Sequence, residues 1–189
     1  ARLLDVAALG LTKIDPQCFS YSHPARFSLV GTMNPEEGDI RPQLLDRFAL
    51  SVKVTGEQDP EKRAEIIKSR LSYETDPEEF VNQWKDEQEK EVSRIERAMD
   101  LLPRISISDD MLLIAAKIAI ILKVDGHRAD ITLIKTAETI AALEGHLEVS
   151  KEDIRKASRL ALPHRMRRRP FEEQELDWSE VDKVIDDEA

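Results

Sequence analysis

The sequence contains few of the residues that build covalent or metal-bound cores. Its 189 residues include one cysteine, Cys18, and one cysteine forms neither an internal disulfide nor a thiolate metal site. No catalytic partner for Cys18 is visible in the sequence. The four histidines lack the spacing of metal ligands, so no metal site is predicted in this chain.

Aromatic residues are also scarce, and acidic residues outnumber basic ones by 38 to 28. Aromatic side chains make up 5% of the chain, and the net charge is −10. Single-stranded nucleic acid is bound on aromatic platforms, and any polyanion needs a basic surface, so we expect no nucleic-acid partner. The most apolar run, residues 111–124, is shorter than a membrane span and includes Lys117. With no signal peptide pattern, we expect no membrane insertion and a cytoplasmic location.

Charged residues are abundant, at 35%, which is typical of a helix-rich protein with large solvated faces. Asp59-Pro60 and Asp76-Pro77 each match a helix start, with Asp as N-cap and Pro at the first helical position. The first helix is predicted to end near Tyr73. The second is predicted to run unbroken to Leu102, and its almost wholly charged middle, residues 85–91, is predicted to be exposed or to project toward a partner.

Three further helices are predicted after residue 105. Ser108 caps the apolar run 111–124, and Asp130 begins a helix that Gly145 ends. Ser150, followed by an acidic residue three positions later, matches a capping box and begins a helix that runs to Leu162.

The first third of the chain has a different pattern. Short apolar runs at 27–32 and 50–54 predict two strands, and 42–48 predicts a short helix. Residues 3–11 show helical spacing, whereas residues 12–26 are irregular. Two strands do not make an independent parallel sheet. We therefore predict a mainly α protein with a small α/β remnant at its start.

Several motifs resemble one family, the AAA+ ATPase subunit of magnesium chelatase. In the first part of the chain they are HPARF at 23–27, VGTMNPEEG at 30–38 and RPQLLDRF at 41–48. In the second part they are GHRAD at 126–130 and PHRMRRRPF at 163–171. Shorter parts of this pattern recur in MoxR-like AAA+ ATPases. The resemblance is weakest between residues 56 and 100 and after residue 173.

The resemblance implies the C-terminal part of an AAA+ module, with the end of the nucleotide-binding sheet followed by a helical lid. The implied divisions are an α/β remnant (1–58), a long helical connector (59–104), a lid domain (105–171) and an acidic C-terminal tail (172–189). The Gly-Lys-Ser/Thr of a P-loop and an acidic Walker B strand do not occur in the sequence. In the family both precede the position of Ala1. We therefore expect this chain alone neither to bind ATP well nor to hydrolyse it.

The resemblance also implies roles for single residues. Asn34 stands at the sensor 1 position, where it would orient the attacking water. Arg47 stands at the arginine-finger position and would reach the γ-phosphate held by a neighbouring subunit, with Asp46 and Arg41 at that interface. Arg128 stands at the sensor 2 position and would contact phosphates of ATP bound by its own subunit. A planar, permanently charged guanidinium bridges two phosphate oxygens, which suits both arginines.

Each residue also has a structural interpretation. Asn34 before Pro is common in turns. Arg47 could pair with Asp46, and Arg128 could be a solvated cation, although it would lie at the unfavourable end of the helix dipole. The basic run 165–169 is interpreted as a solvated face or an ion-pair partner and not as a nucleic-acid site.

For the whole protein, the resemblance implies a ring, expected to be a hexamer, that hydrolyses ATP with Mg²⁺. The ring would drive Mg²⁺ insertion into protoporphyrin IX by a large porphyrin-binding subunit, together with a von Willebrand-type AAA+ partner. Two alternatives remain: a MoxR-type chaperone ATPase that assists metal or cofactor insertion into another protein, and the AAA+ part of a fused subunit with a von Willebrand domain. In a photosynthetic eukaryote the location would be the plastid stroma.

Overall fold

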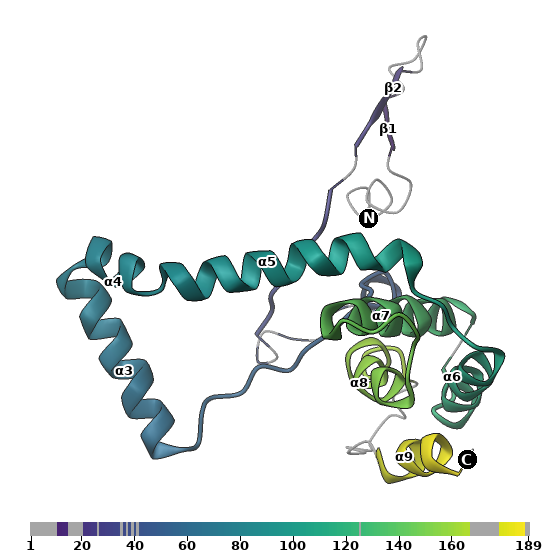
Figure 1. The fold of residues 1–189 in the computed structure, drawn as a ribbon. Helices are drawn as coiled ribbons and strands as arrows, with labels where there is room; N and C mark the ends of the chain where they lie inside the picture. The colour runs from purple at the N-terminus through teal and green to yellow at the C-terminus, as the bar shows by residue number, and fades with distance from the viewer. Residues whose placement is uncertain are drawn as a thin grey trace. The chain divides into compact units, whose positions relative to one another are not determined.

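The computed structural model describes residues 11–14, 21–25, 27–34, 36, 38, 40, 42–124, 126–166 and 178–187. The chain divides into two compact units, Ala1–Leu50 and Ser51–Ala189. Figure 1 shows that helices dominate and that the only described sheet is one hairpin. The predicted mainly helical class is therefore confirmed.

The first unit contains strands β1 (Leu11–Ile14) and β2 (Tyr21–Pro24) and the short helix α2 (Pro42–Leu45). The strands pair antiparallel, with Leu11 opposite Pro24 and Ile14 opposite Tyr21. This hairpin lies where the sequence indicated irregular chain, because Pro24 suggested a break. Pro24 is instead the last residue of an edge strand, where a missing N–H is tolerated. The helix predicted at 3–11 lies almost wholly outside the described residues.

The strands predicted at 27–32 and 50–54 are wrong. Both segments are irregular along their described residues, and Val30 and Val54 are 89% and 90% exposed. A strand needs a partner strand, and neither segment has one among the residues that the structure describes; the Ser51 N–H bonds instead to the Leu160 carbonyl at 3.0 Å.

The second unit begins with three consecutive helices, α3 (Pro60–Thr75), α4 (Pro77–Gln83) and α5 (Lys85–Leu101). The predicted N-caps are confirmed, since Asp59 accepts a hydrogen bond from the Glu61 N–H and Asp76 from the Glu79 N–H. Figure 1 shows α3 meeting α5 through α4, at the end of α5 remote from the other helices. We call α4 with the adjoining ends of α3 and α5, residues 70–91, the elbow.

The unbroken helix predicted over 77–102 is wrong, because the chain breaks at Trp84. Its backbone has φ −94° and ψ 1°, and its N–H bonds to the Val81 carbonyl at 3.2 Å, three residues back. No proline or glycine marks the position. The break coincides with side-chain packing, since the Phe80 and Trp84 rings lie 6.2 Å apart.

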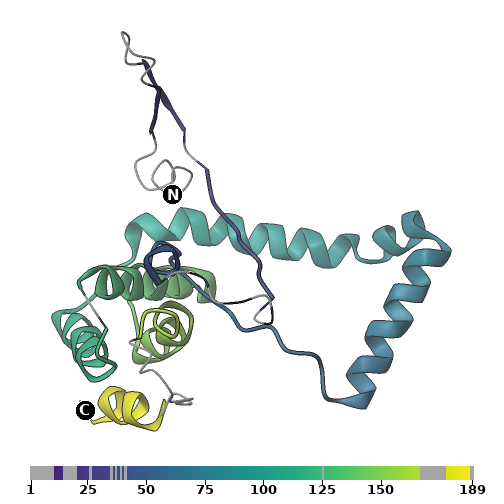
Figure 2. The ribbon, with the colours of Figure 1, turned by 180° about the vertical axis from the view of Figure 1, so that it is seen from behind.

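The remaining helices form the lid bundle, which we define as α6 (Asp109–Ile121), α7 (Arg128–Glu144), α8 (Lys151–Ala161) and α9 (Trp178–Asp186). A single 3₁₀ turn, η2 (Leu102–Arg104), leads into it from α5. Figure 2 shows the bundle from behind, with α5 running along α7 as it does in the first view. A parallel bridge between Ser106 and Glu148 joins the segments that precede α6 and α8.

Local signals set most ends of these helices. Ser108 accepts a hydrogen bond from the Met111 N–H, and Ser150 and Asp153 form a reciprocal capping box, as predicted. Gly145 ends α7 with φ 82°, also as predicted. Three ends differ: α6 stops at Ile121, α7 begins at Arg128, two residues before Asp130, and α8 ends at Ala161, one residue before Leu162.

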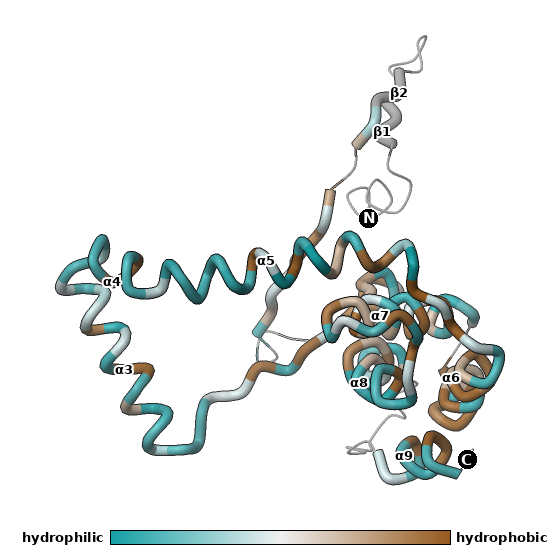
Figure 3. The backbone as a smooth tube through the Cα atoms, in the orientation of Figure 1, coloured by the Kyte–Doolittle hydropathy of each residue, from teal (hydrophilic) through white to brown (hydrophobic). Residues whose placement is uncertain are grey.

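The core of the bundle is apolar and continuous. Figure 3 shows α6 as largely hydrophobic, in contrast to the hydrophilic α3 to α5. The large side chains at its centre have no exposed surface: Ile114, Ile118, Leu133, Ile154, Leu162, Val181 and Ile185.

Helix α9 corrects one assignment. Residues 178–186 were placed in the acidic tail, yet they form a helix whose Val181 and Ile185 are fully buried. It packs against α6 and α8. Its spacing of apolar residues, 181, 184 and 185, is helical, but the surrounding acidic residues obscured the pattern.

Ile185→Ala tests whether α9 belongs to the core. Removing a buried isoleucine side chain leaves a cavity, so we expect the free energy of unfolding to fall by about 2–4 kcal/mol in urea titration. The matched control is Ile120→Ala, because Ile120 is 74% exposed and should change the free energy by less than about 0.5 kcal/mol. Equal effects from the two substitutions would contradict the burial of α9.

Gly145→Ala tests the left-handed end of α7. A Cβ atom at φ 82° is strained, so we expect a loss of about 1 kcal/mol or more in unfolding free energy. Gly56→Ala is the control, because Gly56 has no such φ and a Cβ there would meet nothing within 4 Å. An unfolding free energy of Gly145→Ala equal to that of the unsubstituted chain would contradict this account of the end of α7.

Candidate functional site

Asn34 ends the irregular segment 27–34 in the first unit and is exposed. Its Oδ1 atom accepts a hydrogen bond from the Glu36 N–H at 3.3 Å, which is an Asx-type turn. The turn fixes the side-chain oxygen, so the Nδ2 amide is the group that would donate to a water molecule or a phosphate. The turn interpretation of Asn34 and the sensing interpretation are therefore compatible.

Arg47 lies in the turn that follows α2. Its N–H bonds to the Leu44 carbonyl at 3.2 Å, and the Phe48 N–H bonds to the Leu45 carbonyl at 3.0 Å. The Arg47 side chain is exposed, whereas Asp46 is partly buried. A short, hydrogen-bonded turn thus holds the backbone of Arg47.

A close contact joins these two segments. A Cβ atom at Gly31 would lie 3.3 Å from Cζ of Phe48, tighter than most real contacts. Glycine therefore lets the segment leading to Asn34 pass against the residue next to Arg47. Within the first unit, the structure brings together the segments that carry these two predicted site residues.

Arg128 is the first residue of α7, in the second unit, and its side chain is exposed. The preceding His127 is the N-cap but supplies no side-chain cap; its Nδ1 atom lies 3.2 Å from Oδ2 of Asp130. The next residue, Ala129, is 1% exposed and anchors the helix in the core. An arginine here lies at the positive end of a 17-residue helix dipole, where an anion is favoured.

The remaining predicted positions are distributed as follows. Arg41 and the basic residues 167–169 lie outside the described residues. Arg165 is partly buried, and its Nη1 atom lies 3.5 Å from the carbonyl oxygen of Ala161, the last residue of α8. The roles of Asn34, Arg47, Asp46, Arg41 and Arg128 remain predictions.

Sequence reasoning missed Arg155, which fastens α9 to α8. Its Nε atom donates to Asp182 at 3.0 Å and its Nη2 atom to Asp186 at 2.6 Å, and it also bonds Glu152 on its own helix. The hydrogen bond with Glu152 is the largest cause of a raised pKa of Arg155, with further contributions from Asp182 and Asp186. Only the Glu152 pairing has a local spacing; the other partners lie 27 and 31 residues away.

Described helices offer no membrane crossing. The most apolar of them, α6, has 13 residues, and a crossing needs about 20.

Comparison with known proteins places these features in context. Residues 113–186 match the AAA lid domain family, a range that includes Arg128 and runs to the end of α9. The chain is 45% identical, over 98% of its length, to the magnesium-chelatase subunit ChlI homolog of Methanocaldococcus jannaschii. It is 44% identical, over 90% of its length, to the magnesium-chelatase 38 kDa subunit of Chlorobaculum parvum.

The chain spans about half of these relatives, 51% of the first and 49% of the second. Among solved structures, it resembles a Cytophaga hutchinsonii protein provisionally named an ATPase, with a TM-score of 0.66 and 16% identity. That likeness covers 97% of this chain and 59% of the other. The lid match and this shared fold confirm the predicted architecture, the C-terminal part of an AAA+ module.

Proposed function

Since this chain is a homologue of the magnesium-chelatase ChlI and 38 kDa subunits, we propose that it is part of an AAA+ motor subunit. The parent would couple ATP hydrolysis to Mg²⁺ insertion into protoporphyrin IX, with Mg²⁺ and the porphyrin as substrates of a larger assembly. The observation that carries the proposal is the position of Arg128. This exposed arginine is the first residue of α7, a helix of the AAA lid domain that has one face buried in the core.

ATP fits the residues at this helix start. The first turn of α7 has N–H groups without intrahelical partners, and its dipole favours an anion. Arg128 adds a permanent charge that can bridge two phosphate oxygens. We infer that Arg128 contacts the phosphates of ATP held by its own subunit, and that the P-loop and the ATP-bound Mg²⁺ belong to the part of the parent that this chain does not span.

Arg47 serves the neighbouring subunit in this proposal. An arginine that enters from a second subunit neutralises the charge that develops on the transferred phosphoryl group. Its position in a tight turn after α2 supports that role, because two backbone hydrogen bonds fix where the exposed residue begins. Asp46 and Arg41 would line the same interface, and Asn34 would orient the attacking water through its Nδ2 group.

Assembly follows from the shared site. A finger that acts in the next subunit requires a head-to-tail interface between subunits, and we propose that this interface closes into a hexameric ring. The ring would drive a large porphyrin-binding subunit through a von Willebrand-type AAA+ partner. The proposed location is the cytoplasm, or the plastid stroma in a photosynthetic eukaryote.

Arg47→Ala in the parent tests the finger. We expect steady-state ATP hydrolysis to fall about 10³-fold or more, since the developing charge loses its partner. Mixing this variant with a parent that carries a substituted P-loop lysine should restore part of the activity, because each supplies what the other lacks. Arg63→Ala, at an exposed arginine on α3, is the control and should leave the rate unchanged. Full activity of Arg47→Ala would refute the role.

Arg128→Ala tests the contact within one subunit. Loss of a charge-assisted phosphate contact should weaken ATP binding about 10- to 100-fold in equilibrium titration. Because both missing groups belong to one nucleotide site, mixing Arg128→Ala with the P-loop lysine variant should not restore hydrolysis. Arg104→Ala, at an exposed arginine before α6, is the control. Rescue by mixing would place Arg128 in the neighbour's site instead.

A further inference from the structure

The elbow carries an aromatic cluster on a part of the second unit that stands apart from the lid bundle. The Tyr73 and Phe80 rings meet edge to face at 5.8 Å, and Phe80 lies 6.2 Å from Trp84. Arg70 lies over Tyr73, 5.7 Å from the ring centroid. Rings from α3, from α4 and from Trp84 at the break before α5 therefore share one small apolar centre.

Much of this cluster is accessible. Tyr73 is 41% exposed, Trp84 48% and Val81 60%, while Phe80 is partly buried beneath them. A shallow hollow opens beside the rings and is lined by Tyr73, Pro77, Glu78, Val81 and Asn82. Exposed aromatic side chains around a hollow are typical anchor sites for a partner side chain.

The rim of the elbow is strongly acidic. Residues 70–91 contain eight acidic and three basic side chains, a net charge of −5 and half of the net charge of the chain. The three basic residues are already paired: Arg70 with Glu74, Lys85 with Glu89 and Lys90 with Glu87.

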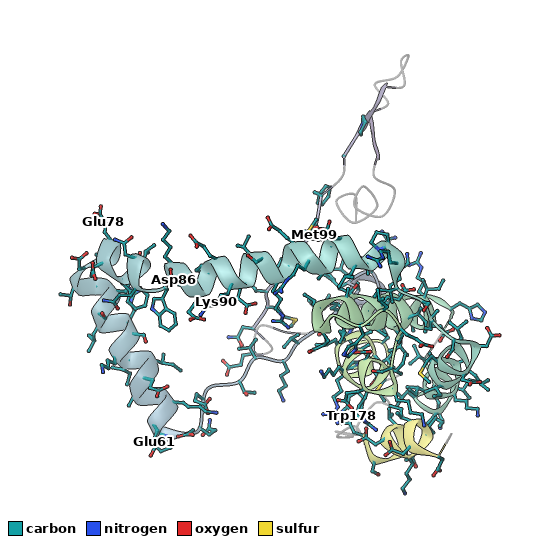
Figure 4. All side chains as sticks on the ribbon, in the orientation of Figure 1. Glu61, Glu78, Asp86, Lys90, Met99 and Trp178 are labelled. Atoms are coloured by element: carbon teal, nitrogen blue, oxygen red, sulfur yellow. The ribbon has the colours of Figure 1, made fainter. Side chains whose placement is uncertain are left out.

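Four carboxylates at the elbow make no ion pair with any described residue, since Glu91 pairs with Arg94 farther along α5. One of the four, Asp76, caps α4 by accepting a hydrogen bond from the Glu79 N–H. The other three, Glu78, Glu79 and Asp86, also make no ion pair with any residue that the structure describes, and Figure 4 labels Glu78 on α4 and Asp86 at the start of α5. The negative charge of the elbow is thus uncompensated within its own helices.

From this combination we propose that the elbow is a docking surface for a basic segment of a partner protein that carries an apolar anchor side chain. The anchor enters the hollow beside Val81, and lysines or arginines of the segment pair with Glu78, Glu79 and Asp86. An arginine of the segment can also stack on the exposed face of Trp84. This goes beyond the proposed ATPase role, because it concerns a surface remote from the predicted phosphate contacts of the lid.

Charge decides the class of partner. Nucleic acids and anionic membranes are repelled by a surface of net charge −5, although both could contact exposed aromatic rings. A basic protein segment is attracted over the Debye length, and its apolar anchor side chain then enters the hollow beside Tyr73 and Val81. Binding should therefore weaken as salt rises.

The test uses three synthetic helical peptides of equal length. The first carries leucines on one face and arginines on the other. The second replaces the arginines with glutamates, and the third replaces the leucines with serines. Each is labelled and titrated with this chain while fluorescence anisotropy is recorded. We expect the leucine–arginine peptide to bind, the serine–arginine peptide to bind at least tenfold more weakly, and the leucine–glutamate peptide not to bind. Equal binding of both arginine peptides would overturn the proposal, since it would show a charge effect without an anchor.

Variants locate the binding. Glu78→Gln, Glu79→Gln and Asp86→Asn together should weaken the leucine–arginine peptide at least tenfold, and so should Trp84→Ala. The matched control removes three carboxylates outside the elbow that make no ion pair with a described residue, by Glu61→Gln, Glu65→Gln and Glu96→Gln, and should leave binding within twofold. If the control weakens binding as much as the elbow variant, the charge acts non-specifically and the proposal is wrong.

The parent protein provides the last arm of the test. The leucine–arginine peptide should bind the parent as it binds this chain, because the proposed partner is a separate protein. Loss of binding in the parent would show that the parent's own residues cover the elbow, and would also overturn the proposal. ATP hydrolysis does not enter these measurements, so their failure is distinguishable from failure of the Arg47 and Arg128 assignments.

Discussion

Burial of one apolar core by α6, α7, α8 and α9 is the constraint on which the second unit depends. Leu133 on α7, Ile154 on α8 and Ile185 on α9 have no exposed surface and lie in a single cluster with the apolar face of α6. Since Ala129 is buried in the same cluster, the rotation of α7 is fixed one residue from Arg128. The core thereby determines which way the proposed phosphate contact faces.

Ion pairs refine what the core establishes. Arg155 reaches Asp182 and Asp186 from α8, and Arg159 lies 5.7 Å from the centroid of the Trp178 ring. These contacts hold α9 against α8. Arg155 is mostly shielded from solvent, which makes its pairs worth more than those on an open surface. The acidic residues of α9 are thus partly structural.

Local chemistry predicted most of this fold. Asp59, Ser108, Ser150 and Gly145 act within a few residues of their own backbone, so the helix ends they set were visible in the sequence. The break at Trp84 was not visible, because it accompanies ring packing rather than a proline or glycine. The strand predictions at 27–32 and 50–54 failed for a related reason: strands require partners that a short apolar run does not reveal.

The candidate site divides in the same way. Asn34, Arg47 and Arg128 were found through motifs, whereas the contact between Gly31 and Phe48 and the network of Arg155 join residues far apart in the sequence. A motif identifies the residue types of a site but not the backbone structure that positions them. The structure shows the backbone that positions each arginine: Arg47 lies in a tight turn, and Arg128 lies at the start of a helix that packs in the core.

The central claim is that two arginines of this chain meet two different nucleotides in an assembled ring. The most direct measurement is a cryo-electron microscopy structure of the parent assembly with a non-hydrolysable ATP analogue. The account predicts that each nucleotide contacts Arg128 of the subunit that holds it and Arg47 of the neighbouring subunit. A structure in which both arginines of one subunit approach the same nucleotide, or in which neither touches a phosphate, would contradict it.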